Sequence, residues 1–402
     1  MKIVYIIEKF PSPTEYFILN EILELQRRGI KLDIIVLRKQ KQFFDIPALK
    51  ELKCSLFYLP KIYLYLPFLI FFNEPIAFIK SLALFFNDIS RKQSLKTFRD
   101  YCISIYFASK LEKNQKFHFH AHFAFLAVDI ASLLSKINKT KYSLTMHAQD
   151  IYTNEEKLRR VISDCNFLIT CTEYNKKYLN EITYHKFENK IHRIYHGIDT
   201  SNWICKKAKP LENSPTKILC IARLVEKKGL VYLLEAMHKL INEGLNIQCT
   251  IIGEGTLKEE LANYIEDNNL EKYIVLLDFQ PQDIVKYILL KSDIFVLPSI
   301  IAENGDRDGL PNVIVEAMTL GIPVISTGIS AIPEMIENRH TGLLVKDKDA
   351  NAIVNAIKEL ISDENLYTSI VENAKKKIKS ELEIRHCTDY LINVYQNNVE
   401  MY

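Results

Sequence analysis

Residues 293–327 read DIFVLPSIIAENGDRDGLPNVIVEAMTLGIPVIST. The apolar runs at 293–297 and 323–327 have the length of buried strands, and the spacing between them predicts a helix from about Asn312. A strand, a helix and a second strand in this order form the repeating unit of a parallel sheet. This segment therefore predicts an α/β fold.

The same alternation of short apolar runs and amphipathic stretches extends over the rest of the chain. In the N-terminal half, strands are expected at 2–7, 31–37, 117–123, 141–147, 166–172 and 190–196. After a polar stretch the pattern restarts, with further strands at 217–224, 246–252, 273–279 and 341–345. Two Rossmann-like doubly wound domains that face a cleft are predicted, with these parts: domain 1–204, linker 205–216, domain 217–380 and a terminal helix 381–402 that packs back on the first domain.

Composition restricts the class of protein. The 402 residues are 48% hydrophobic and 25% charged, as expected for globular domains, and the net charge is only +3. No block of Lys and Arg suggests a nucleic-acid partner. The eight cysteines lie mostly in apolar runs without a C-x-x-C pair, which favours reduced core residues and a cytoplasmic protein. The N-terminal apolar run is too short for a signal peptide.

An apolar insert at about 54–86 is the one unusual segment. Its residues 56–86, LFYLPKIYLYLPFLIFFNEPIAFIKSLALFF, are interrupted by prolines and charges, so an uninterrupted membrane span is not expected. Two interpretations stay open. The insert is either a buried helical hairpin of the first domain or an apolar lip that touches the cytoplasmic face of the inner membrane.

The loop and helix after the strand at 293–297 contain the strongest candidate site. Asp308 lies in the loop, and Glu316 lies about one turn into the helix, so both acids can point toward one ligand. The backbone N–H groups of Gly309 and Leu310, with the helix N-terminus, favour a phosphate. The alternative is that Asp308 only caps the helix and Glu316 is solvated.

Two more segments of the second half predict contacts with a nucleotide. Arg223 and Lys228 share a strand-to-helix junction, where two cations can neutralise a diphosphate and stabilise it as a leaving group without a metal. A solvated basic turn is the alternative. Gly253 and Gly255 form a glycine-rich turn after a strand, without the G-x-G-x-x-G spacing of a dinucleotide fingerprint.

Histidines dominate the candidate residues of the first half. His147 ends a strand and Asp150 follows it, which places His147 to contact a sugar or relay a proton, although a structural role is the common one for such a residue. His118, His120 and His122 alternate along one strand and share a face. Because no carboxylate occurs at a supporting spacing, zinc is not expected there.

The motifs occur together and in a recognisable order. They include FPSPTEYFILNEILELQRRG, HAHF, SLTMHAQDIY, IYHGID, ARLVEKKG, IIGEGTLKEEL, DGLPNVIVEAM, GIPVIST and TGLLV. In these segments the chain resembles the retaining GT-B glycosyltransferases of family four, also called glycosyl transferases group 1. The resemblance is greatest to the branch that builds bacterial exopolysaccharides and colanic-acid-like polymers.

The resemblance implies roles for the matching residues. Arg223 and Lys228 would bind the donor diphosphate, and Glu316 would bind the ribose hydroxyls. Asp308 would hold hydroxyls of the transferred sugar, and His147 would lie beside that sugar, which makes Asp308, Glu316 and His147 the candidate catalytic residues. Two departures matter: Asp308 stands where the family usually has Glu, and PSPTEYF replaces a glycine-rich first loop. The candidates on the acceptor side are Thr14, Glu15, His122 and Asp150.

The function implied is metal-independent transfer of a sugar, with retention of configuration, from a UDP- or GDP-sugar to a saccharide or lipid-linked saccharide. No cofactor is expected. The alternatives are a nucleotide-sugar epimerase of the same fold, a nucleotide-sugar-binding scaffold whose site has decayed, and a scaffold at a membrane assembly for polysaccharides.

Overall fold

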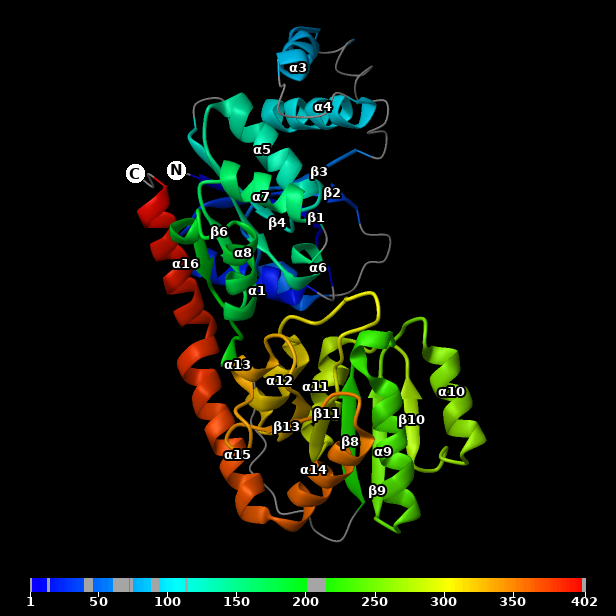
Figure 1. Ribbon diagram of the computed structural model, residues 1–402. Helices are drawn as coiled ribbons and strands as arrows, with labels where there is room; N and C mark the ends of the chain where they lie inside the picture. The colour runs from blue at the N-terminus through cyan, green and yellow to red at the C-terminus, as the bar shows by residue number, and fades with distance from the viewer. Residues whose placement is uncertain are drawn as a thin grey trace. The chain divides into compact units, whose positions relative to one another are not determined.

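The computed structural model describes residues 2–12, 15–39, 46–60, 72, 75–87, 94–112, 115–152, 154–200 and 215–399. The chain forms two compact units (Figure 1): unit 1 comprises Met1–Cys171, Asn175–Gly197 and Ile384–Tyr402, and unit 2 comprises Thr172–Tyr174 and Ile198–Glu383. Each unit is built around one parallel sheet, so the predicted α/β fold with two Rossmann-like domains is confirmed. Of the predicted linker, residues 205–214 lie outside the described ranges.

Unit 1 contains, among the residues described, a seven-stranded sheet in the order β3-β2-β1-β4-β5-β6-β7, with every pair of neighbours parallel. The strands are β1 (Lys2–Lys9), β2 (Leu32–Arg38), β3 (Leu56–Tyr58), β4 (Phe117–His122), β5 (Tyr142–Met146), β6 (Leu168–Thr170) and β7 (Ile191–Arg193). The strand order reverses between β1 and β4. The loops that follow these two strands therefore leave the sheet at its topological switch point, where open α/β sheets bind ligands.

Strand β3 was not predicted, because it lies at the start of the apolar insert that the sequence suggested was helical. Its three residues are too few to show a period, and Pro60 follows closely. Leu56 pairs with Ile34 of β2, which makes β3 an edge strand of the sheet. The interpretation of residues 54–86 as a helical insert is therefore wrong at its beginning.

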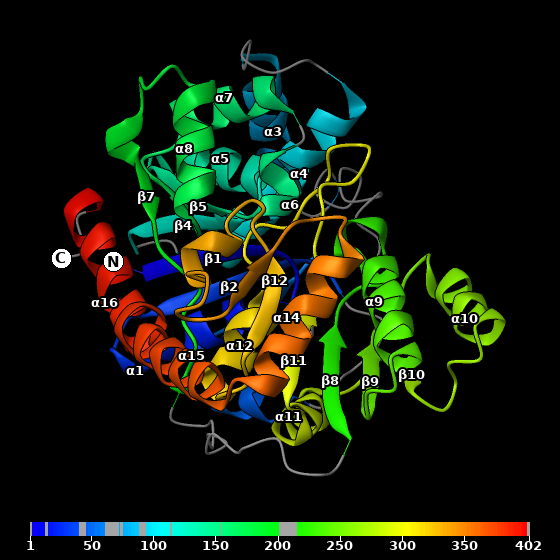
Figure 2. The same ribbon diagram turned by 60° about the horizontal axis from the view of Figure 1, so that its bottom comes forward.

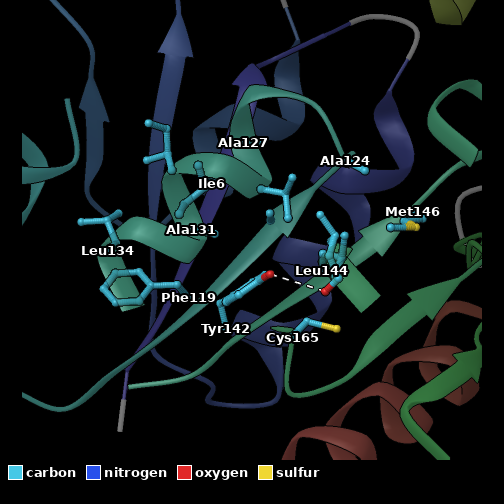
Figure 3. Close-up of a cluster of buried hydrophobic side chains, with 14 of the residues drawn as sticks. Ile6, Phe119, Ala124, Ala127, Ala131, Leu134, Tyr142, Leu144, Met146 and Cys165 are labelled. Carbon is cyan, nitrogen blue, oxygen red and sulfur yellow. Dashed lines mark hydrogen bonds between the residues drawn. The ribbon is translucent and has the colours of Figure 1, made fainter. Parts of the chain in front are cut away.

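Helices pack on this sheet through small side chains. Figure 3 shows Ile6, Phe119 and Leu144 of three strands packed near Ala127 and Ala131 of α5, and all five residues are buried. Alanines let a helix approach the sheet closely, which fills the core without voids. The helices of unit 1 are α1 (Tyr16–Arg27), α3 (Pro75–Asn87), α4 (Leu95–Lys110), α5 (Leu126–Asn138), α6 (Ala148–Ile151), α7 (Glu155–Asp164), α8 (Glu173–Ile182) and α16 (Ile384–Asn398).

Helix α3 lies outside this core and packs on α4 (Figure 1). Phe85 of α3 meets Phe98 of α4 edge to face, with ring centroids 5.5 Å apart. On its other side Ile76, Ile79 and Phe86 are 72%, 63% and 60% exposed, so α3 is not part of a buried hairpin. That interpretation is wrong for α3, because these three apolar side chains stay largely exposed. Residues 61–71 of the insert lie outside the described ranges, and no described helix is long and apolar enough to cross a membrane.

The described part of unit 2 contains a six-stranded sheet in the order β10-β9-β8-β11-β12-β13, again with parallel neighbours. Its strands are β8 (Thr216–Ile221), β9 (Ile247–Ile252), β10 (Ile274–Leu277), β11 (Ile294–Leu297), β12 (Val324–Thr327) and β13 (Leu343–Val345). All six overlap predicted strands. The order reverses between β8 and β11, so the loops after these strands share the switch point of unit 2.

The helices of unit 2 connect these strands and pack in pairs, with α9 beside α14 and α12 beside α15 (Figure 2). They are α9 (Leu230–Asn242), α10 (Lys258–Asp267), α11 (Gln282–Lys291), α12 (Asn312–Leu320), α13 (Ile332–Met335), α14 (Ala350–Ser362) and α15 (Glu364–Lys377). Helix α12 begins at Asn312, as the sequence predicted. Helix α16 belongs to unit 1, where Arg28 and Asp389 form an ion pair of 2.8 Å.

Candidate functional site

The loops after β8 and β11 meet at the switch point of unit 2 and bring two predicted site residues together. Lys228 Nζ lies 2.6 Å from Asp308 Oδ2, and both side chains are buried. The Ser299 hydroxyl donates to the same carboxylate oxygen at 2.9 Å. The Ile300 N–H donates to the Lys227 carbonyl at 2.8 Å and holds the two loops in contact. The Lys228 ammonium is thus neutralised by Asp308.

Lys227, the neighbouring lysine, was not among the predicted site residues. It is buried, and its Nζ lies 2.8 Å from Asp306 Oδ1 and 3.8 Å from Asp308 Oδ1. Two lysines and two aspartates therefore form one compact ion-pair cluster. Burial of a lysine is costly unless a carboxylate compensates its charge, so the two aspartates explain how both lysines can be buried here.

Arg223 differs from these lysines because it is exposed at the end of β8, and no residue that the structure describes forms an ion pair or hydrogen bond with its side chain. The two glycines of the predicted turn support the loop that carries it. A Cβ at Gly253 (φ +155°) would lie 1.8 Å from the Ala222 carbonyl oxygen, and one at Gly255 (φ +159°) would lie 2.3 Å from that of Leu224. The glycines therefore allow backbone to pack on backbone beside Arg223.

The N-terminus of α12 provides the remaining predicted groups of unit 2. Within residues 215–399, no acceptor is found for the N–H groups of Gly309 and Leu310. Glu316 lies one turn into α12, is half-buried, and has no partner among the described residues. Burial raises the pKa of Glu316 to about 7. This edge of unit 2 combines a free cation, free N–H donors and an acid that titrates near neutrality.

In unit 1, His147 lies at the end of β5, directly before helix α6. It is buried, and burial lowers its pKa well below the usual value, helped by neighbouring His196 and His122. Both ring nitrogens have partners, since Nε2 lies 3.4 Å from His122 Nδ1 and Nδ1 lies 3.2 Å from His196 Nε2. His147 is therefore a neutral imidazole between two other histidines.

Asp150, an acceptor-side candidate, fixes the loops around His147. Its Oδ1 accepts a hydrogen bond of 2.7 Å from the His147 N–H, and its Oδ2 accepts one from the Ala124 N–H. Burial raises the pKa of Asp150 to about 7, against the effect of these backbone donors. The carboxylate thus connects the loop after β4 with the loop after β5.

Two further acceptor-side candidates, Thr14 and Glu15, follow β1 in the sequence. Thr14 is outside the described residues. Glu15 is half-buried directly before α1, and burial raises its pKa, while the nearby His122 acts in the opposite direction. Glu15 lies in the loop after β1, and the assignment of Thr14 and Glu15 to the acceptor stays a prediction.

Hydroxyl groups of β5 bind the other histidines of β4. Ser143 Oγ lies 2.7 Å from both His118 Nε2 and His120 Nδ1, and Thr145 Oγ1 lies 3.0 Å from His120 Nε2. Burial lowers the pKa of His118 to about 3 and that of His120 well below its usual value. These neutral rings are hydrogen-bonded to hydroxyls of the neighbouring strand, which indicates that His118 and His120 have a structural role.

One described cluster has ligand atoms close enough for a metal ion, and it differs from the histidine triplet considered in the sequence. It consists of His147, Cys171 and His196, whose ligand atoms lie within 4.8 Å of one another. The nearest nitrogens of its two histidines already lie at hydrogen-bond distance. Independence from metals stays a prediction.

The sequence analysis missed Phe17, Glu21 and His196. Glu21 Oε1 lies 3.5 Å from His122 Nε2, so a carboxylate does support this histidine, from helix α1 rather than from a nearby position in the chain. His196 stands in the IYHGID segment after β7, and Phe17 stacks on it with centroids 4.0 Å apart. A histidine directly after a parallel strand was the one available signal.

Comparison with known proteins adds independent findings. Residues 201–377 match the family model described as Glycosyl transferases group 1. The amylovoran biosynthesis glycosyltransferase AmsK of Erwinia amylovora is 38% identical over 192 residues, 48% of this chain and 47% of AmsK. The UDP-Gal:alpha-D-GlcNAc-diphosphoundecaprenol alpha-1,3-galactosyltransferase of Escherichia coli is 24% identical over 332 residues, 78% of this chain and 83% of that protein. Anabaena HepE in complex with UDP-glucose has a TM-score of 0.69 at 15% identity, over 99% of this chain and 100% of HepE.

These comparisons define the class of the protein. The likeness to HepE over its whole length shows that the fold is GT-B, the architecture of two Rossmann-like domains predicted from the sequence. Residues 201–377 match the glycosyl transferases group 1 model, and AmsK, a relative over about half of this chain, is named for amylovoran biosynthesis. The chain spans about half the length of relatives such as AmsK.

Proposed function

We propose that this protein is a glycosyltransferase that moves a sugar from a nucleotide-diphosphate sugar to a saccharide or lipid-linked saccharide during synthesis of a bacterial surface polysaccharide. The observation that carries this proposal is the edge of unit 2, where unpaired Arg223 stands in the same switch-point region as the free N–H groups of Gly309 and Leu310. Such an edge suits a diphosphate. The names of AmsK and of the E. coli galactosyltransferase support the activity, and the UDP-sugars named for that enzyme and for HepE favour a UDP-sugar donor.

Each group has a defined task in this proposal. Arg223 and the α12 N-terminus take the negative charge that accumulates on the leaving nucleoside diphosphate. Lys228 keeps one N–H on Asp308 and has two more to donate, so it serves the diphosphate without losing its partner. Asp308 accepts hydrogen bonds from hydroxyls of the transferred sugar. Glu316, when ionised, accepts them from the ribose.

The proposed reaction retains configuration and needs no metal. The acceptor hydroxyl attacks the anomeric carbon on the face from which the diphosphate leaves, so that the new C–O bond forms as the bond to phosphate breaks. The leaving phosphate takes the proton of the acceptor hydroxyl. NMR of the product tests this step, because an inverted anomeric centre would exclude it.

Donor binding is the decisive experiment for the proposal. UDP-, GDP- and ADP-sugars would be compared by calorimetry on the wild type, on Arg223→Ala, and on Lys272→Ala, an exposed lysine before β10 at the opposite edge of the sheet. One nucleotide sugar should bind the wild type and the lysine variant but not Arg223→Ala. Binding of none would overturn the proposal, and turnover of the donor without any acceptor would indicate the epimerase instead.

The proposed site of action is the cytoplasmic face of the membrane, with α3 as the contact. Its Ile76, Ile79 and Phe86 are 72%, 63% and 60% exposed and give the helix an apolar side, and Leu95 at the start of α4 is 89% exposed. Such a side suits the boundary between lipid headgroups and acyl chains. Flotation with anionic vesicles tests the contact, which Ile79→Asp should abolish. Equal flotation of both proteins would exclude α3 as the contact.

A further inference from the structure

Five polar side chains of unit 1 form a chain of close contacts that runs from Tyr5 of β1 to His196. Tyr5 donates to Glu21 Oε1 at 2.6 Å, and the same oxygen lies 3.5 Å from His122 Nε2. His122 Nδ1 then faces His147 Nε2 at 3.4 Å, and His147 Nδ1 faces His196 Nε2 at 3.2 Å. Each histidine therefore uses one ring nitrogen toward Glu21 and the other away from it.

The charge of Glu21 sets the direction of these contacts. Burial alone would raise the pKa of Glu21, but the hydrogen bonds from His122 and Tyr5 hold it below its usual value, so the side chain is a carboxylate that only accepts. Burial lowers the pKa of His147 well below the usual value and that of His196 to about 4, so both rings are neutral. A neutral imidazole has one donor and one acceptor.

With all three rings neutral, one pattern of protons satisfies every contact. His122 must carry its proton on Nε2 to donate to Glu21, which leaves Nδ1 as an acceptor. His147 then donates from Nε2 to His122, and His196 donates from Nε2 to His147. Any other pattern places two lone pairs or two protons against each other in a buried site, which costs a hydrogen bond.

The chain ends at His196, whose Nδ1 is left as a bare acceptor. His196 is half-buried, and no described residue pairs with this nitrogen. Phe17 stacks on the ring with planes 24° apart, which fixes the direction of Nδ1. His147, in contrast, has both nitrogens inside the chain and none left for a ligand.

We propose that His196 is a further substrate-binding residue, whose Nδ1 accepts a hydrogen bond from a sugar hydroxyl. Glu21 and His122 are positioning residues, which set the direction of hydrogen-bond donation, called the polarity here, through His147. The inference deepens the proposed function and rests on it for the nature of the ligand. It also changes the role predicted for His147, from contact with the sugar to transmission of the polarity. The ligand recognised is a neutral polyol, in keeping with the neutral rings of His147 and His196.

The tautomers can be measured without activity. Long-range ¹H–¹⁵N correlation NMR of histidine-labelled protein should show Nε2–H tautomers for His122, His147 and His196. Glu21→Gln should shift His196 toward the Nδ1–H form, because the new amide can donate to His122. Glu24→Gln is the matched control, since Glu24 is a buried glutamate of the same helix that pairs with Arg28 instead.

Kinetics then connect the tautomers with the ligand. His196→Gln should lower kcat/KM for transfer about ten-fold, the usual size for one lost hydrogen bond to a substrate, while the affinity for UDP without a sugar stays unchanged. Glu21→Gln should lower kcat/KM several-fold, and Glu24→Gln should not. An unchanged kcat/KM in His196→Gln would overturn the contact with the sugar.

Two outcomes would overturn the chain of contacts itself. These are an Nδ1–H tautomer of His196 in the wild type, and a stoichiometric zinc ion on the His147, Cys171 and His196 cluster, found by metal analysis. Failure of the proposed function is distinguishable from either. If the tautomers are as expected but no nucleotide sugar binds, the chain of histidines stands and the transferase does not.

Discussion

Units 1 and 2 share a doubly wound topology but place opposite chemistry at the carboxyl ends of their strands. In unit 2, Lys227 and Lys228 are buried, and each has an aspartate within ion-pair distance. In unit 1, burial lowers the pKa of His147 and His196, so both rings are neutral, and among the described residues no carboxylate lies at hydrogen-bond distance from their ring nitrogens. Burial thus preserves charge where a partner compensates it and removes charge where none does.

The difference suits the two kinds of ligand in the proposed reaction. A charged edge with an unpaired arginine attracts a diphosphate, whereas a row of neutral rings offers hydrogen bonds to hydroxyls without attracting anions. The division of labour therefore follows from which side chains the loops carry, and not from the topology of the sheets. Four experiments would break or sharpen this comparison.

The largest effect is expected where the charged edge depends on close backbone packing. Gly253→Ala should destabilise the fold by about 4 kcal/mol, because its Cβ would meet the Ala222 carbonyl oxygen at 1.8 Å. Gly244→Ala is the control. It also has a positive φ (+82°) but nothing within 4 Å of its Cβ, and should cost only about 1 kcal/mol. Urea unfolding measures the loss of unfolding free energy in both variants. Equal losses would show that the 253–255 turn can shift to accommodate the added Cβ.

The buried ion pair of unit 2 comes next. Lys228→Met should cost about 3 kcal/mol, because it leaves the buried Asp308 carboxylate without its cation. Lys258→Met removes one partner of the exposed pair with Asp278 and should cost far less, because solvent screens that pair. Thermal unfolding compares them. A small loss at Lys228 would mean that Asp308 takes up a proton or finds water, and the charged edge would then resemble that of unit 1.

Arg223→Ala should change binding and not stability. Loss of a cation that contacts a diphosphate is worth roughly 2 kcal/mol, or about thirty-fold in the affinity for UDP. Because Arg223 is exposed and unpaired among the described residues, the free energy of unfolding should stay within about 0.5 kcal/mol of the wild type. Raising the salt concentration should weaken UDP binding in the wild type more than in the variant. If the affinity for UDP falls equally with salt in the wild type and in Arg223→Ala, the diphosphate does not contact Arg223.

The fold was predictable from the sequence because strands that are buried on both faces read as continuous apolar runs, as in KIVYII and DIFVL. Strand β3 was missed because an edge strand of three residues inside a longer apolar segment has no distinct pattern. The face of α3 that stays exposed was not predictable either. Apolar residues on both sides of a helix do not show which side finds a partner.

The site was predictable where a motif brings residues together along the chain, as with Asp308 and Glu316. The pairing of Lys228 with Asp308 joins residues 80 positions apart, and that of Glu21 with His122 joins two separate elements of unit 1. Such contacts depend on the order of strands in a sheet and on how a helix rotates on it. The carboxylate that the sequence lacked near the histidines was therefore present in α1.

The smallest effect concerns pH and separates the units most directly. Burial raises the pKa of Glu316 to about 7, above its value in an unfolded chain, so the fold favours the protonated acid. The stability that the protonated acid contributes is therefore lost as the pH rises from about 4.5 to 7. Ribose hydroxyls need the ionised form as acceptor. Affinity for UDP should therefore increase severalfold between about pH 6 and pH 8 in the wild type and in Glu260→Gln, an exposed glutamate of α10, and much less in Glu316→Gln. Because His147 and His196 stay neutral over this range, substitutions there should leave the pH dependence intact. If the affinity of the wild type for UDP does not change with pH, the ribose does not bind at Glu316. If a substitution of His196 removes the pH dependence, His196 is charged in this range and the contrast between the two units is lost.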